Sequence, residues 1–108
     1  MAVSAPSVAS ARDPIGEELA QIEGRLGAGA FEQVLSDLQA LHRMAPGDAR
    51  VASRLARLLQ QRGLIRYGQG DVAQAIADLG RAVELDPAMP SARVLLELAS
   101  RELATPPR

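Results

Sequence analysis

An internal repeat constrains the fold of this chain more than any other feature of its sequence. Residues 27–46 and 68–87 align at a constant offset of 41. The identical pairs are Gly27/Gly68, Gly29/Gly70, Gln33/Gln74, Asp37/Asp78, Leu38/Leu79 and Pro46/Pro87. A fixed period of roughly 20–50 residues is typical of stacked-repeat proteins, which bury their apolar faces between neighbouring units. Such proteins present surfaces to other molecules, so the repeat predicts a binding protein without identifying what it binds.

Apolar residues recur at the spacing of amphipathic helices. The first stripe advances by four, three and four residues, through Ile15, Leu19, Ile22 and Leu26. Asp13 suits the N-cap of this helix and Pro14 its first position, and the glycines of residues 27–29 favour the left-handed turn that ends helices. Along the whole chain, this reasoning predicts an all-α protein with five helices, at about 14–27, 30–45, 49–67, 71–85 and 90–103.

Length, charge and composition exclude several classes of protein. The 108 residues fit one small domain, and the chain contains no Cys, which excludes disulfides and thiolate metal sites. The net charge of −1 provides no overall field to attract nucleic acid. No apolar run approaches the roughly 18 residues that a membrane span needs. We expect a cytoplasmic protein without direct membrane insertion, with flexible tails at 1–12 and 105–108.

The second half of the repeat resembles a known family. The residues that carry the resemblance are Gly70, Asp71, Val72, Ala75, Ile76, Leu79, Ala82, Val83, Leu85, Asp86 and Pro87. They match the second helix of a tetratricopeptide repeat, and the family's first-helix signature falls on Ala52, Leu55, Ala56, Leu59 and Gly63. The resemblance covers about residues 14–103, as two repeats plus a closing helix. It implies a short α-solenoid of stacked antiparallel helix pairs within residues 13–104.

The chain departs from the family pattern in two places. The family unit has about 34 residues, whereas the period here is 41, and the additional residues lie between Gly63 and Gly70. Seven residues make about two helical turns, so we expect a longer third helix. Glu18 and Gln21 occupy positions at which the family prefers apolar residues, so we expect the first repeat to pack less regularly.

No constellation of residues indicates catalysis. His42 is the only histidine, and we expect a partly buried, hydrogen-bonded imidazole there, because a metal site would need further ligands. The serines have no nucleophile motif around them. The glycine turns lack the strand–turn–helix context of a phosphate loop. We therefore expect no enzyme activity, no cofactor and no bound metal.

The third helix carries a polar stripe that lacks acidic residues. Arg50, Arg54, Arg57 and Gln61 fall within about 60° of one another on a helix. The resemblance implies that these side chains face the concave groove, where arginine can hold carboxylates of a partner segment bidentately. The alternative interpretation is that the arginines pair with local acids, namely Glu18, Glu23 or Asp48.

The last helix has apolar residues beyond those that its packing requires. Its core stripe consists of Ala92, Leu95, Leu96, Ala99 and Leu103, whereas Val94 and Leu98 point to nearly the opposite side. We predict that these two residues contact a second molecule, either another copy of the chain or another subunit. The alternative is that they are isolated apolar residues of the kind that every protein surface contains.

These observations predict a non-catalytic protein–protein interaction module. It would act as an adaptor or assembly scaffold that binds a partner segment in a helical groove, an acidic segment being one option. The alternative function is that of a structural accessory subunit, packed permanently into a larger multiprotein complex. The partner itself is not identifiable from the sequence.

Overall fold

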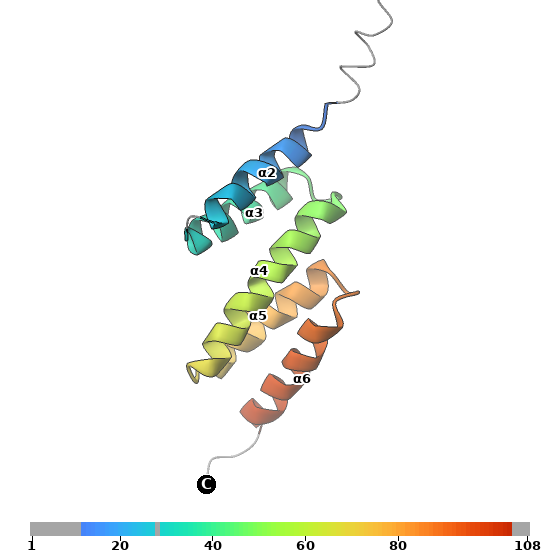
Figure 1. Ribbon diagram of the computed structural model, residues 1–108. Coiled ribbons are helices and arrows are strands. Elements are labelled where there is room, and N and C mark those ends of the chain that lie inside the picture. Colours follow the sequence, from blue (N-terminus) through green and yellow to red (C-terminus); the bar gives the residue numbers. More distant parts are fainter. Residues whose placement is uncertain (1–11, 28, 105–108) are drawn as a thin grey trace, which may run out of the picture.

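The computed structural model describes residues 12–27 and 29–104, and this part of the chain folds into five α-helices (Figure 1). They are α2 (Pro14–Leu26), α3 (Phe31–Met44), α4 (Ala49–Gly68), α5 (Val72–Leu85) and α6 (Pro90–Ala104). Each end lies within one residue of its predicted place, and the described residues form no strand. The all-α prediction is confirmed. The predicted tails, 1–12 and 105–108, lie outside the described residues except for Arg12.

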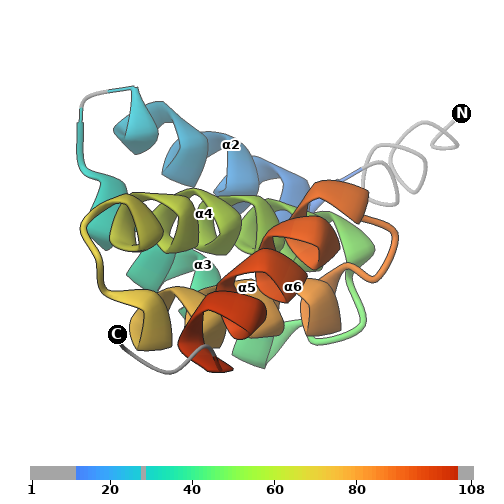
Figure 2. The ribbon, with the colours of Figure 1, turned by 90° about the horizontal axis from the view of Figure 1, so that it is seen from below.

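Each helix packs on the next one along the chain, and α6 also contacts α4. In Figure 1, α2 and α4 lie in front of α3 and α5, and in the view of Figure 2 they lie above them. The longer third helix is also confirmed, since α4 has 20 residues and α2 has 13. The chain therefore forms two helical hairpins, α2–α3 and α4–α5, followed by α6.

The two hairpins turn in the same way. Gly29 and Gly70 have φ angles of 85° and 83°, in the left-handed region that glycine tolerates best. The amide of Gly29 donates to the carbonyl of Leu26, and the amide of Gly70 donates to that of Tyr67, both at 3.0 Å. These residues are equivalent at the offset of 41. The sequence repeat is thus a repeat of backbone conformation.

The connections that follow the hairpins also correspond. After α3, the amide of Ala45 donates to the carbonyl of Leu41, and after α5 the amide of Asp86 donates to that of Ala82, both at 2.9 Å. Both cap residues leave the helical region, with φ near −134° and −142°. The chain consequently enters α4 and α6 from similar geometries.

One apolar core runs through the helices. Its buried residues are Leu19, Ile22, Val34, Leu35, Leu38, Leu41, Val51, Leu55, Ala56, Leu58, Leu59, Ala82 and Ala92. Between α4 and α5 the packing is especially close at Gly63. A Cβ added there would lie 3.0 Å from the Cγ of Leu79 and 3.3 Å from the carbonyl oxygen of Ala75. The absence of a side chain on Gly63 allows this close approach.

Candidate partner-binding surfaces

The first predicted site residue, Arg50, is held by two aspartates that begin helices. Asp13 is the N-cap of α2 and accepts from the amide of Gly16 at 3.0 Å, and Asp48 is the N-cap of α4. The guanidinium of Arg50 donates to both carboxylates, with 2.8 Å between its Nη2 and Oδ2 of Asp48. Arg50 therefore ties the start of α2 to the start of α4.

The electrostatics of this cluster follow from the hydrogen bonds. The bond from Arg50 lowers the pKa of Asp48 to about 2, and it also lowers the pKa of Asp13. In return the two carboxylates raise the pKa of Arg50, Asp48 contributing most. The charge of Arg50 is thus already compensated within the molecule.

Arg54 is also paired within the molecule. Its Nε donates to the carboxylate of Glu23, which joins α4 to α2. For Arg50 and Arg54 the alternative interpretation, pairing with local acids, therefore holds. Glu23 and Asp48 are among the expected partners, whereas Asp13 is not.

The remaining two predicted groove residues, Arg57 and Gln61, are exposed on α4. Arg57 forms no ion pair with a carboxylate of the described residues. Both residues border a small cavity of about 100 Å³ lined by Glu23, Leu26, Val34, Leu38, Arg54, Arg57, Leu58 and Gln61. Of the predicted arginine stripe, Arg57 is thus the residue whose charge remains available.

Two hydrogen bonds set the register of α6 against α4. The side-chain Nε2 of Gln60 donates to the hydroxyl of Ser91 at 3.0 Å, and the hydroxyl of Tyr67 donates to the carboxylate of Glu102. The Glu102 bond also raises the pKa of Tyr67. The two helices are therefore joined at two points along a shared seam.

Both helices of this seam carry exposed aliphatic residues. Val94 and Leu98 of α6 are 55% and 48% exposed, so their predicted orientation away from the core is confirmed. Leu64 of α4 is exposed to a similar degree. None of the three belongs to the buried core. Large aliphatic side chains exposed close together mark a surface that a partner can cover.

A buried ion cluster between α4 and α5 was not predicted. Asp78 is only 5% exposed, and Arg62 donates to both of its carboxylate oxygens at 2.9 Å. Arg66 donates to the same carboxylate at 3.0 Å. The pairing with Asp78 raises the pKa of Arg62. Because this carboxylate is enclosed by its own arginines, we assign it to the stability of the fold.

The sequence contained a signal for this cluster. In the first hairpin, Arg25 pairs with Asp37 at 2.7 Å, and both residues have equivalents at the offset of 41 in Arg66 and Asp78. A repeated Arg–Asp combination at equal spacing on successive hairpins indicates a repeated ion pair. The offset therefore relates interactions as well as backbone turns.

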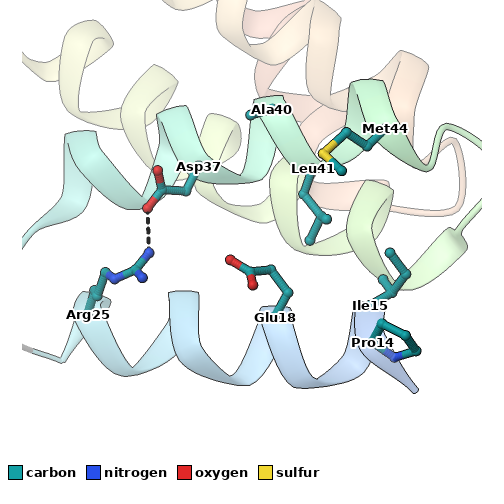
Figure 3. Close-up of a pocket in the computed structure, with 8 residues that line it drawn as sticks. All are labelled: Pro14, Ile15, Glu18, Arg25, Asp37, Ala40, Leu41 and Met44. Carbon is teal, nitrogen blue, oxygen red and sulfur yellow. Dashed lines mark hydrogen bonds and ion pairs between the residues drawn. The ribbon is translucent and has the colours of Figure 1, made fainter. Parts of the chain in front are cut away.

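Two larger pockets lie on either side of α3. The end pocket, of about 580 Å³, opens between α2 and α3 (Figure 3) and is lined by Pro14, Ile15, Glu18, Arg25, Asp37, Ala40, Leu41 and Met44. The inner pocket, of about 330 Å³, is lined by Gln39, His42, Arg43, Leu55, Leu59 and Arg81. The Nδ1 atom of His42 is buried and has no hydrogen-bond partner among the described residues, so the expectation of a hydrogen-bonded ring is wrong for this nitrogen.

Within residues 12–27 and 29–104, no group of three or more potential metal-ligating side chains comes together. Among the same residues, no helix combines the length and apolar character that crossing a bilayer requires. Comparison with protein-family models finds no match for the chain, and comparison with curated proteins finds no relative. The surfaces described above are therefore the basis for assigning a function.

Proposed function

We propose that the chain is a non-catalytic protein–protein interaction module of the tetratricopeptide type, which holds a partner segment against α4 and α6. One observation carries the proposal: an unpaired cation and three exposed aliphatic side chains gather on one face of these two helices. This α4–α6 face consists of Arg57, Gln61, Leu64, Val94 and Leu98. The repeated hairpin turns support the family assignment.

Helix geometry places the aliphatic residues together. Around α4, Leu64 lies about 40° from Gln60 and about 60° from Tyr67, the two residues that bond to α6. Around α6, Leu98 lies about 20° from Ser91 and about 40° from Glu102, which are their partners. Both leucines therefore border the same seam, between its two hydrogen bonds.

The rest of the face follows from the same geometry. Val94 precedes Leu98 by one helical turn, and Arg57 lies on the same side of α4 as Leu64, two turns earlier. A partner segment that crosses this face thus meets a guanidinium at one end and aliphatic side chains at the other.

This surface fits a segment with apolar side chains and a carboxylate. Fully burying one aliphatic side chain contributes about 1.5–3 kcal/mol, and these residues are half-exposed, so each has about half of that to gain. A carboxylate on Arg57 would add a charge-assisted hydrogen bond and would fix the direction of the segment. Arg50 and Arg54 contribute less, because a partner would first have to displace their own carboxylates.

Site-specific photocrosslinking in the native cell tests this assignment. A photoreactive residue would replace Leu64, Leu98 or, as the control, Ser36, which is exposed on α3. We expect the same partner to crosslink from positions 64 and 98 but not from position 36. Arg57→Glu should reduce the yield of the crosslinked partner, and Arg57→Lys should retain most of that yield. Crosslinking of unrelated proteins from the two test positions would contradict the proposal.

The second candidate function is that of a structural accessory subunit in a larger complex. A specific observation favours it, because Met44, Ile65 and Leu103 are also large, apolar and exposed, and they lie off the α4–α6 face. A subunit of this kind should aggregate or unfold when expressed alone, whereas an adaptor should be a folded monomer. Gel filtration with light scattering and a thermal melt of the isolated chain distinguish the two functions.

A further inference from the structure

The end pocket and the inner pocket occupy equivalent places in the two hairpins. The end pocket lies on the α2–α3 hairpin and the inner pocket on the α4–α5 hairpin. At the offset of 41, three residues that line the end pocket correspond to three that line the inner one: Pro14 to Leu55, Glu18 to Leu59 and Ala40 to Arg81. The two pockets are thus the same feature of successive repeats.

They differ in their third wall. In the inner pocket this wall is α3, which contributes Gln39, His42 and Arg43. In the end pocket no third helix of the described residues lines the cavity, which is larger, at about 580 Å³ against about 330 Å³. Met44 at its rim is 80% exposed, whereas the equivalent Leu85 is half-buried. Within residues 12–27 and 29–104, the end pocket therefore has the shape of a repeat interface without its third helix.

We infer that the end pocket is the docking site for an amphipathic helix of a partner protein, which packs there as α3 packs on α4–α5. The interior of the chain shows what such a helix must carry. On α3, Leu35 and Leu38 are buried in the core, and His42 and Arg43 follow one turn later beside the pocket. A docking helix thus needs two aliphatic residues three or four positions apart, followed by a basic residue.

Glu18 specifies the charge of the occupant. It stands where the second hairpin has the buried Leu59, and its carboxylate turns into the pocket (Figure 3). Glu18 forms no ion pair with the described residues, and the guanidinium of Arg25 beside it is already bonded to Asp37. An unpaired carboxylate at a partly apolar site favours a partner that supplies a cation.

The chain provides its own probe for this site. A capped peptide of residues 31–44, stapled through positions 32 and 36 to hold it helical, carries Leu35, Leu38, His42 and Arg43 in the required order. Stapling is needed because an isolated helix of this length is marginal in water. Amide chemical shifts of the ¹⁵N-labelled chain would locate the peptide, and fluorescence anisotropy would give its Kd. We expect the largest changes in amide chemical shift at residues that line the end pocket, namely Ile15, Glu18, Ala40 and Met44.

A charge exchange tests the specificity of docking. Glu18→Arg should raise the Kd of the peptide about tenfold, since it replaces an attraction with a repulsion. A peptide with His42→Glu and Arg43→Glu should bind the wild-type chain poorly and the Glu18→Arg chain well. Ala77→Glu, a change at an exposed position of α5 outside both proposed surfaces, is the control and should leave peptide binding unchanged. Circular dichroism melts would verify that both variants fold.

Three results would overturn the inference. Chemical-shift changes confined to α4 and α5 would mean that the peptide merely replaces the chain's own α3. Failure of the charge exchange to restore binding would mean that Glu18 does not select the partner. Self-association of the wild-type chain that Met44→Glu abolishes would show that the occupant is a second copy.

Discussion

The two helical hairpins share their turns and their Arg–Asp pair but differ in how deeply they bury that pair. In α2–α3, the side chain of Asp37 is 25% exposed and bonds to one arginine, Arg25. In α4–α5, the side chain of Asp78 is 6% exposed and bonds to both Arg62 and Arg66. Equal local sequence thus produces equal local structure, while the surroundings decide how much each interaction contributes.

Two substitutions between the hairpins account for the difference. At the offset of 41, Ile22 of α2 corresponds to Gly63 of α4, and Gln21 corresponds to Arg62. The glycine lets α5 approach α4 closely, and Arg62 supplies the second guanidinium to Asp78. In addition, α4 packs against α3, α5 and α6, whereas α2 packs mainly against α3. The second hairpin is therefore the more enclosed of the two.

Breaking the buried pair should have the largest effect on stability. Asp78→Ala leaves Arg66 without a carboxylate and Arg62 with only the exposed Glu32, in a partly buried site. We expect a loss of about 3 kcal/mol in the free energy of unfolding. The matched change in the first hairpin, Asp37→Ala, should cost only about 0–1 kcal/mol. Urea unfolding of both variants measures the difference. Equal losses would mean that burial does not distinguish the hairpins.

The next effect concerns the close packing of α4 on α5. Gly63→Ile places the first hairpin's residue in the second, where even a Cβ meets Leu79 and the Ala75 carbonyl, so we expect a loss of about 2–3 kcal/mol. Gly24→Ile is the control, because a Cβ on Gly24 meets nothing within 4 Å. Its unfolding free energy should change by no more than about 0.5 kcal/mol. An unchanged free energy of unfolding for Gly63→Ile would contradict the close packing of α4 on α5 at this position.

The shared turns should respond equally in the two hairpins. Gly29→Ala and Gly70→Ala each force a side chain into the left-handed region, at a cost of about 1 kcal/mol. Neither position has atoms close to an added Cβ, so strain in φ is the whole effect. Thermal unfolding should show two similar decreases in Tm. Clearly unequal decreases in Tm would show that the two turns are not equivalent.

The smallest effect concerns the link between the starts of α2 and α4. Because Arg50 lowers the pKa of Asp48 from 3.8 to about 2, the stability from this pair is present above about pH 4. It is lost as the pH falls toward 2, where the carboxylate protonates in the folded state too. Asp48→Asn keeps a capping side chain but loses the charge. Its unfolding free energy should approach that of the wild type as the pH falls through this window.

A second variant for this pH dependence is Arg50→Gln, which removes the guanidinium that bonds to Asp48. Its difference from the wild type should also shrink as the pH falls from 4 toward 2. Parallel curves for wild type and Asp48→Asn would contradict the role of Arg50.

The helices were predictable because their signals are local. The stripe from Ile15 to Leu26, the glycines at the turns and the aspartates at the helix starts act within a few residues. From signals of this kind, both ends of all five helices followed to within one residue. The outward orientation of Val94 and Leu98 was predictable for the same reason, since the angle between two side chains on one helix depends only on their spacing.

The partners of the arginines were only partly predictable. Asp48 lies two residues from Arg50, and its role could be named from the sequence, whereas Asp13 reaches Arg50 only when α2 packs beside α4. The burial of Asp78 depends in the same way on how closely α5 approaches Gly63. Contacts between distant segments follow from packing, which periodicity does not specify.

The sequence by itself determined where the helices of this protein begin and end, that its two hairpins turn alike, and which faces of its helices are apolar. These properties depend on φ preferences, capping and the helical period, all of which act within one or two turns of the chain. Only the tertiary structure decided two other features of the described residues. Arg50 and Arg54 have carboxylate partners among them whereas Arg57 does not, and α3 lines the inner pocket whereas none of these residues adds a third helix to the end pocket. Both depend on which helices lie side by side, and that is decided by the packing of the whole core.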